Sequence, residues 1–102
     1  MPEVVFRNLS EIEPDKVNVE RFGRTRVAVV MYENNYYAFK NVCTHAEVSL
    51  SDGILCGKSI ECTMHGAKFD FTTGDVLKAP AIRPLEMYKT RIENDKLLVE
   101  MD

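Results

Sequence analysis

The stretch CTMHGAKFDF, residues 62–71, begins with Cys62 and carries His65 three positions later, followed by a glycine and an alternating apolar pattern. The sequence contains only two histidines, and the other one, His45, lies two positions after Cys43. The chain therefore holds two Cys/His pairs, and sixteen residues separate them. Each pair offers one thiolate and one imidazole, so the spacing indicates a site for a metal or a metal cluster.

The composition indicates one globular domain over residues 1–102. The net charge of −3 argues against a nucleic-acid partner, because such proteins usually present a basic face. The longest apolar run, VAVVMY at residues 27–32, is too short to span a membrane. The first residues show no signal-peptide pattern, and three cysteines are an odd number for a disulfide scaffold. We therefore expect a cytoplasmic protein that contacts no membrane.

The apolar pattern predicts an all-β chain of short strands, with turn residues between them. We expect an edge strand at its start, a central strand over residues 27–32, a turn at Asn34-Asn35 and a proline-broken loop over residues 76–84. Residues 11–16 could form at most one helical turn. The expected strands span residues 3–9, 17–22, 27–32, 36–42, 53–56, 59–62, 67–71, 85–93 and 96–101.

Three kinds of site are compatible with the two pairs. A [2Fe–2S] cluster can take two thiolates on one iron and two imidazoles on the other. A Zn²⁺ ion also accepts two cysteines and two histidines, although zinc fingers usually group like residues in one pair. A Cys–His nucleophile would leave the duplication of the pair unexplained. The cluster is therefore the favoured interpretation, with zinc as its competitor.

The pattern Cys43-x-His45, then Cys62-x-x-His65-Gly66, resembles the Rieske [2Fe–2S] motif. The similarity extends through NVCTH, LSDG, IECTMHGAKFDFTTGDV and APAIRPLEMY, about half of the chain. The sequence resembles the soluble Rieske-type ferredoxins of bacterial aromatic-ring dioxygenase systems. It is also similar to the small Rieske subunit of assimilatory nitrite reductase.

That resemblance implies a fold of three small antiparallel sheets. A cluster-binding subdomain, about residues 41–80, would be inserted in a basal β-barrel or sandwich. Loops over residues 43–48 and 62–69 would bind the cluster, and a third loop over residues 79–84 would shield it. The resemblance assigns Cys43 and Cys62 to the inner iron. It assigns His45 and His65 to the outer iron.

Four positions depart from the high-potential Rieske proteins. Val48 and Met64 replace a pair of cysteines, so no disulfide can join the two ligand loops. Ala67 and Phe69 replace a serine and a tyrosine whose hydroxyls donate to the cluster sulfurs. Because such donors stabilise the more negative reduced state, their absence predicts a midpoint potential near the low end of the Rieske range, about −150 mV.

The resemblance implies a one-electron carrier that is not itself an enzyme. It would accept electrons from an NAD(P)H-dependent flavin reductase and pass them to a terminal oxygenase, as a monomer with transient partners. A permanent Rieske subunit of a larger oxidoreductase, such as nitrite reductase, and a zinc-stabilised binding module are the alternatives. We expect Cys56, which lies outside the motif, to be a buried apolar residue, and Gly66 to allow close backbone approach to the cluster.

Overall fold

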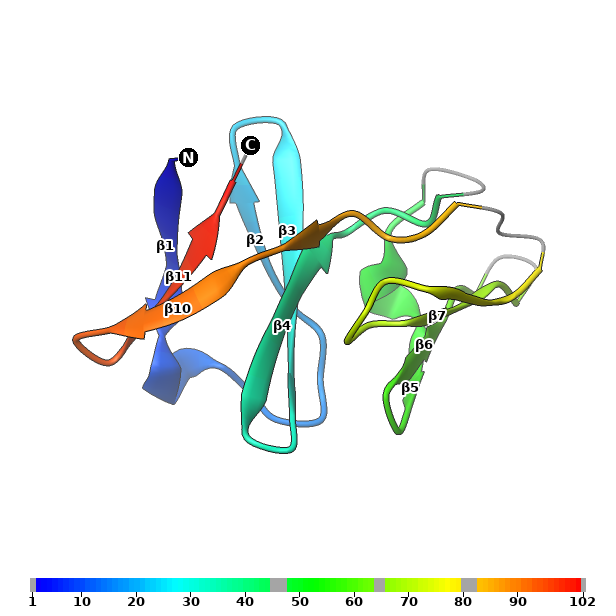
Figure 1. Cartoon of the computed structure of the whole chain (residues 1–102), viewed down its shortest axis with the longest axis horizontal. Helices are drawn as coiled ribbons and strands as arrows, with labels where there is room; N and C mark the ends of the chain where they lie inside the picture. The colour runs from blue at the N-terminus through cyan, green and yellow to red at the C-terminus, as the bar shows by residue number, and fades with distance from the viewer. Residues whose placement is uncertain (1, 45–47, 64–65, 80–82, 102) are drawn as a thin grey trace.

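The computed structural model describes residues 2–44, 48–63, 66–79 and 83–101 (Figure 1). Its strands form three antiparallel sheets, which we name the terminal sheet (β1-β11-β10), the central sheet (β2-β3-β4-β9) and the distal sheet (β5-β6-β7-β8). The expected all-β fold of three small sheets is confirmed. The strands are β1 (Glu3–Asn8), β2 (Asn18–Phe22), β3 (Thr25–Tyr32), β4 (Asn35–Lys40), β5 (Ile54–Cys56), β6 (Ser59–Glu61), β7 (Lys68–Asp70), β8 (Val76–Lys78), β9 (Met87–Tyr88), β10 (Thr90–Glu93) and β11 (Lys96–Glu100).

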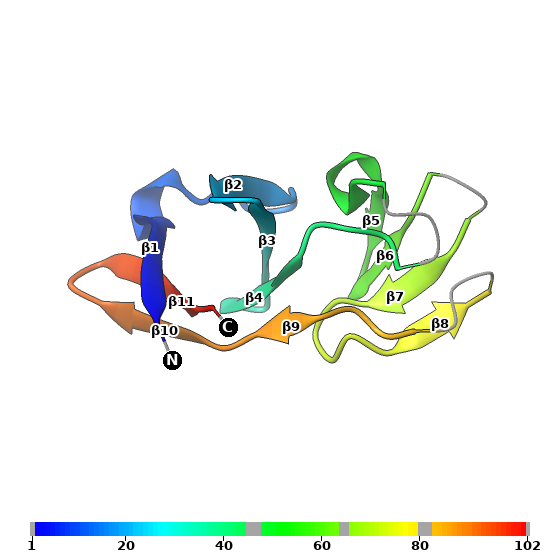
Figure 2. The same cartoon turned by 90° about the horizontal axis from the view of Figure 1, so that it is seen from above.

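The apolar run at residues 27–32 lies in β3, at the middle of the molecule, with the terminal sheet on one side and the distal sheet on the other (Figure 2). Side chains alternate between the two faces of a strand. Val27 and Val29 pack in a core with residues of the terminal sheet, whereas Ala28 and Val30 pack in a core with residues of the distal sheet. The run is continuous, rather than alternating, because β3 is buried on both faces.

The expected strand over residues 85–93 is divided between two sheets. Met87 and Tyr88 of β9 pair with β4 in the central sheet, and Thr90 begins β10, which pairs with β11 in the terminal sheet. The exposed Lys89 lies at the crossover. The Thr90 hydroxyl donates a hydrogen bond to the carbonyl oxygen of Tyr36, 3.3 Å away, which joins the two sheets where the strand changes partner.

Two local expectations are shifted along the chain. The β3–β4 turn has Glu33 and Asn34 at its centre, both with positive φ, and not Asn34-Asn35. The observed register pairs Ala28 with Phe39, which fills the core toward the distal sheet. The single helical turn expected within residues 11–16 is a 3₁₀ turn at Leu9–Glu11.

The expected loop over residues 76–84 begins with the strand β8, so this expectation was wrong for residues 76–78. In β8, Val76 pairs with Phe69 and Lys78 pairs with Lys68, with an irregularity in the register between these two pairs. The preceding turn is organised by Asp70, whose carboxylate accepts hydrogen bonds from the backbone N–H and the hydroxyl of Thr72, at 2.9 and 2.6 Å. A side chain at the end of β7 thus directs the chain back along the same sheet.

Cys56 is exposed, and not buried as the apolar pattern predicted. It ends β5, the edge strand of the distal sheet, on the face opposite to Leu55, which packs against the core. Ile54, on the same face as Cys56, is 60% exposed. A short edge strand buries only one of its faces, and Cys56 lies on the other.

Candidate metal centre

Cys43 lies just beyond the end of β4, where the chain leaves the central sheet. The backbone N–H of Asn41 donates to the carbonyl oxygen of Arg26, at 2.8 Å, and so extends the pairing with β3. Two residues later the N–H of Cys43 donates to the carbonyl oxygen of Val48, at 2.7 Å. That bond closes the first loop, and Cys43 is completely buried at its base.

Cys62 has an equivalent position after β6 in the distal sheet. Its backbone N–H donates to the carbonyl oxygen of Ala67, also at 2.7 Å, and the chain then continues into β7. The side chain of Cys62 is 1% exposed. In both loops, therefore, the backbone N–H of a buried cysteine is hydrogen-bonded to the residue five positions further on. In the sequence, the proposed histidine ligand lies between these two residues.

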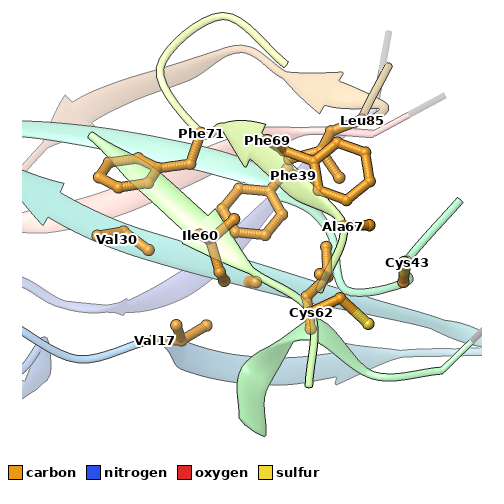
Figure 3. Packing of buried hydrophobic residues seen from close by; sticks show 12 residues of the cluster. Val17, Val30, Phe39, Cys43, Ile60, Cys62, Ala67, Phe69, Phe71 and Leu85 are labelled. Atoms are coloured by element: carbon orange, nitrogen blue, oxygen red, sulfur yellow. The ribbon is translucent and has the colours of Figure 1, made fainter. Parts of the chain in front are cut away.

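The two cysteines belong to the same apolar cluster, together with Ala67, Phe69 and Leu85. Figure 3 shows Cys43 and Cys62 at one end of this cluster, next to Ala67. Phe69 is a completely buried core residue. The two sulfur donors are thus contributed by different sheets and are surrounded by side chains that exclude water.

His45, His65 and Met64 lie outside the described residues, so the structure describes two of the four proposed ligands. Over the described ranges no group of three or more His, Cys, Asp and Glu side chains is gathered into a metal site. The two buried thiols nevertheless fit a [2Fe–2S] cluster that takes its cysteines on one iron. Soft sulfur donors suit iron–sulfur clusters, and the apolar surroundings would shield the cluster from solvent.

Two glycines shape the loops for different reasons. Gly66 has a φ of +73°, which favours glycine, but a Cβ there would make only ordinary contacts, the closest at 3.6 Å to the Glu61 carboxylate. Crowding among the described residues therefore does not require Gly66. Gly53 has an ordinary φ, but a Cβ there would lie 2.4 Å from the carbonyl oxygen of Glu61 and 2.8 Å from that of Leu50. Of these two glycines, Gly53 is therefore the one that crowding requires.

The third loop returns to the core at Leu85. This side chain is buried in the cluster that holds the two cysteines, and its backbone N–H donates to the carbonyl oxygen of Gly74, at 2.8 Å. Just before it, Arg83 contacts the first ligand loop. The hydroxyl of Thr44 donates to the carbonyl oxygen of Arg83 at 2.7 Å, and Nη2 of Arg83 donates to the carbonyl oxygen of Thr44 at 3.1 Å. Sequence patterns did not indicate this contact, because the two residues are 39 positions apart.

Asp70 is the one buried carboxylate in this part of the described chain. Burial raises the pKa of Asp70, but the hydrogen bonds from Thr72 and the nearby charge of Lys58 outweigh that effect and leave the pKa below its ordinary value. The Lys58 ammonium lies 3.7 Å from the carboxylate. Asp70 is therefore a charged anchor for the β7–β8 turn, next to the core that surrounds the two cysteines.

Comparison with known proteins identifies the class to which this fold and these loops belong. The Rieske [2Fe-2S] domain family matches residues 3–89, and the chain belongs to this family. The ferredoxin component of the naphthalene 1,2-dioxygenase/salicylate 5-hydroxylase systems of a Ralstonia species is 37% identical over 90 residues, which cover 88% of this chain and 86% of that one. The family carries one [2Fe–2S] cluster per domain.

Solved structures give the same result. The ferredoxin of carbazole 1,9a-dioxygenase from Nocardioides aromaticivorans IC177 superposes with a TM-score of 0.88 at 28% identity, covering 97% of each chain. A complex of reduced oxygenase and oxidized ferredoxin in carbazole 1,9a-dioxygenase contains a chain that matches with a TM-score of 0.87 at 30% identity, covering 95% of this chain and 91% of that one. Within the described ranges, no helix is long and apolar enough to cross a membrane.

Proposed function

We propose that this chain is a one-electron carrier whose [2Fe–2S] cluster is bound by Cys43, His45, Cys62 and His65. The observation that carries the proposal is the equivalent placement of Cys43 and Cys62, which are both buried and both hydrogen-bonded to the residue five positions further on. When bound, such a cluster supplies a one-electron redox couple. Residues 41–80 would form the cluster-binding subdomain of a single domain that spans residues 1–102.

The chain's own residues would exclude water from one side of the cluster. Ala67, Phe69 and Leu85 pack in the same core as the two cysteines and fill the space on their inner side. An electron would therefore enter and leave on the side that faces away from this core. A transient partner could dock there without unfolding any part of the central sheet.

The relatives support a terminal oxygenase as the electron acceptor. They are ferredoxin components of dioxygenase systems, and the carbazole dioxygenase structure contains a ferredoxin in complex with its oxygenase. We propose a flavin-dependent reductase, fed by NAD(P)H, as the electron donor. We also propose that the carrier is a monomer in the cytoplasm, where an exposed thiol such as that of Cys56 would remain reduced.

The proposed midpoint potential lies near the low end of the Rieske range, about −150 mV. Ala67 and Phe69 are both completely buried in the cluster that holds the cysteines, and neither side chain can donate a hydrogen bond to a sulfur. A low potential suits electrons that come from a reduced flavin. The chain would act as a carrier and not as a catalyst, because its two histidines are both assigned to the cluster.

The purified protein tests this proposal by its iron, sulfide and zinc content and by its EPR spectrum after reduction with dithionite. We expect two irons and two acid-labile sulfides per chain and the low-field-shifted EPR signal of a Rieske centre. A colourless protein that contains zinc would instead establish the binding module. Gel filtration and co-purification distinguish a free carrier from a permanent subunit, because only the subunit would elute with a larger enzyme.

A further inference from the structure

Thr44 and Arg83 join two loops that are far apart in the sequence. The Thr44 hydroxyl donates to the backbone carbonyl of Arg83, and the Arg83 guanidinium donates to the backbone carbonyl of Thr44. Each side chain thus bonds the other residue's main chain, which fixes both backbones at the contact. Thr44 lies between the proposed ligands Cys43 and His45, so the fixed carbonyl belongs to the peptide bond that leads into residue 45.

The backbone that carries Arg83 is attached to the core and to the central sheet. Two residues later Leu85 is buried in the core, and the backbone N–H of Lys40 donates to the carbonyl oxygen of Glu86, at 2.9 Å. The segment that carries Arg83 is therefore held against the end of β4. Both hydrogen bonds with Thr44 are therefore made from a segment that is already held in place.

The contact also places a positive charge beside the first ligand loop. Thr44 and Arg83 line a small cavity together with Lys40 and Glu86, whose opposite charges offset each other. Arg83 therefore supplies the net charge of that cavity. The arginine side chain is exposed, so salt screens its field.

We propose that Arg83 is a positioning residue that clamps the third loop onto the first ligand loop through Thr44, and that its fixed charge raises the midpoint potential of the cluster. This inference rests on the proposed function. The clamp would retain the cluster, because opening the first loop has to break two hydrogen bonds to a segment that is held against the end of β4. The charge would stabilise the reduced state, because the cluster gains one negative charge on reduction.

A double-mutant cycle on cluster loss tests the clamp. Thr44→Val removes the hydroxyl donor, Arg83→Ala removes the guanidinium, and the decay of visible absorbance in the presence of a chelator reports loss of the cluster. We expect each single variant to lose its cluster roughly threefold faster than the wild-type protein, because a single exposed hydrogen bond makes only a small net contribution to stability. The double variant should lose its cluster faster than either single variant, because each substitution removes a different one of the two hydrogen bonds. Single variants that lose the cluster at the wild-type rate would overturn the clamp, whereas a Thr44→Ser variant with the wild-type rate would support it.

Redox titration tests the charge. Arg83→Gln should lower the midpoint potential at low ionic strength, and the difference should shrink at about 1 M salt, where the Debye length is about 3 Å. Arg83→Lys keeps the charge and should restore most of the potential, even if it retains the cluster less well. An Arg83→Gln variant with an unchanged midpoint at low salt would overturn this part of the proposal.

Two lysines serve as matched controls. Nζ of Lys78 would lie 3.8 Å from a Cβ built at Gly66, so Lys78→Gln removes a charge beside the second ligand loop. It should lower the midpoint without accelerating cluster loss, and equal acceleration would overturn the clamp. Lys89→Gln, at the exposed crossover between β9 and β10, should change neither quantity. A wild-type protein without iron and sulfide would instead refute the proposed function, so the two failures are distinguishable.

Discussion

Cys43 and Cys62 occupy equivalent positions in two loops that come from different sheets. In each case the backbone N–H of the cysteine donates, at 2.7 Å, to the carbonyl oxygen of the residue five positions further on, Val48 or Ala67. Both side chains are buried in one apolar cluster. The loops can therefore present two sulfur donors from a shared, dry base, although no disulfide joins them.

Removing either histidine should abolish the Rieske centre. His45→Ala and His65→Ala each delete one imidazole, and an iron that loses a ligand will not keep the low-field-shifted EPR signal of a Rieske cluster. The measurement is the EPR spectrum of the reduced variant, together with its iron and sulfide content. Cys56→Ser is the matched control, because Cys56 is exposed on the outer face of β5 and should leave the spectrum unchanged. A normal signal in either histidine variant would refute the ligand assignment.

Adding hydroxyl groups beside the cysteines should raise the midpoint potential. Ala67→Ser and Phe69→Tyr each introduce a donor at a completely buried position of the cluster core. A hydrogen bond that strengthens on reduction by about 1 kcal/mol corresponds to roughly 40 mV in a one-electron couple. Phe71→Tyr is the control, because Phe71 packs edge-on against Tyr32 and Tyr37 in another part of this core. Redox titration of the three variants would contradict the argument if only the control shifted, or if none did.

The parts of the fold that were predictable depend on local patterns. Residues 27–32 form a continuous apolar run because β3 is buried on both faces, and that run identified the central strand directly. The turns also carried local signals, although Asn34 belongs to a turn that begins one residue earlier than expected. The two Cys/His pairs were recognisable because their spacing is local and specific.

The parts that were missed depend on contacts between distant residues. β8 became a strand through its pairing with Phe69 and a turn held by Asp70, which a proline-rich stretch does not reveal. The expected strand over residues 85–93 is divided because β9 pairs with β4, whereas β10 pairs with β11 in another sheet. The exposure of Cys56 depends on the position of β5 at a sheet edge, and the Thr44–Arg83 contact has no local signal at all.

Gly53→Ala should destabilise the protein by crowding the space between the two ligand loops. The added Cβ would lie 2.4 Å from the carbonyl oxygen of Glu61, which precedes Cys62, and 2.8 Å from that of Leu50, which follows the first loop. We expect a cost of about 2 kcal/mol, seen as a lower Tm, together with faster loss of the cluster. Gly57→Ala in the β5–β6 turn is the control, because Gly57 has a positive φ but, its chain neighbours aside, none of the described residues comes within 4 Å of its Cβ position. It should lower the Tm by backbone strain alone, and an equal effect on cluster loss would exclude crowding as the cause.

Asp70 should make the protein more stable at neutral pH than in acid. Its pKa in the folded protein lies below the ordinary value of 3.8, so the stability it contributes is fully present above about pH 4. That contribution is lost as the pH falls through the folded pKa, because protonation removes the attraction of Lys58 and weakens the bonds from Thr72. Thermal unfolding between pH 3 and pH 7 measures the effect.

The Asp70→Asn variant separates this carboxylate from the other acidic groups. Its amide oxygen can still accept from Thr72, so we expect a loss of roughly 1 kcal/mol at pH 7 and a smaller loss on acidification than in the wild-type protein. Asp75→Asn is the matched control, because Asp75 lies in the same turn but is exposed. If the Asp70→Asn protein lost stability in acid as steeply as the wild-type and Asp75→Asn proteins, the acid sensitivity would have to come from other carboxylates, and Asp70 would not be the charged anchor of the β7–β8 turn.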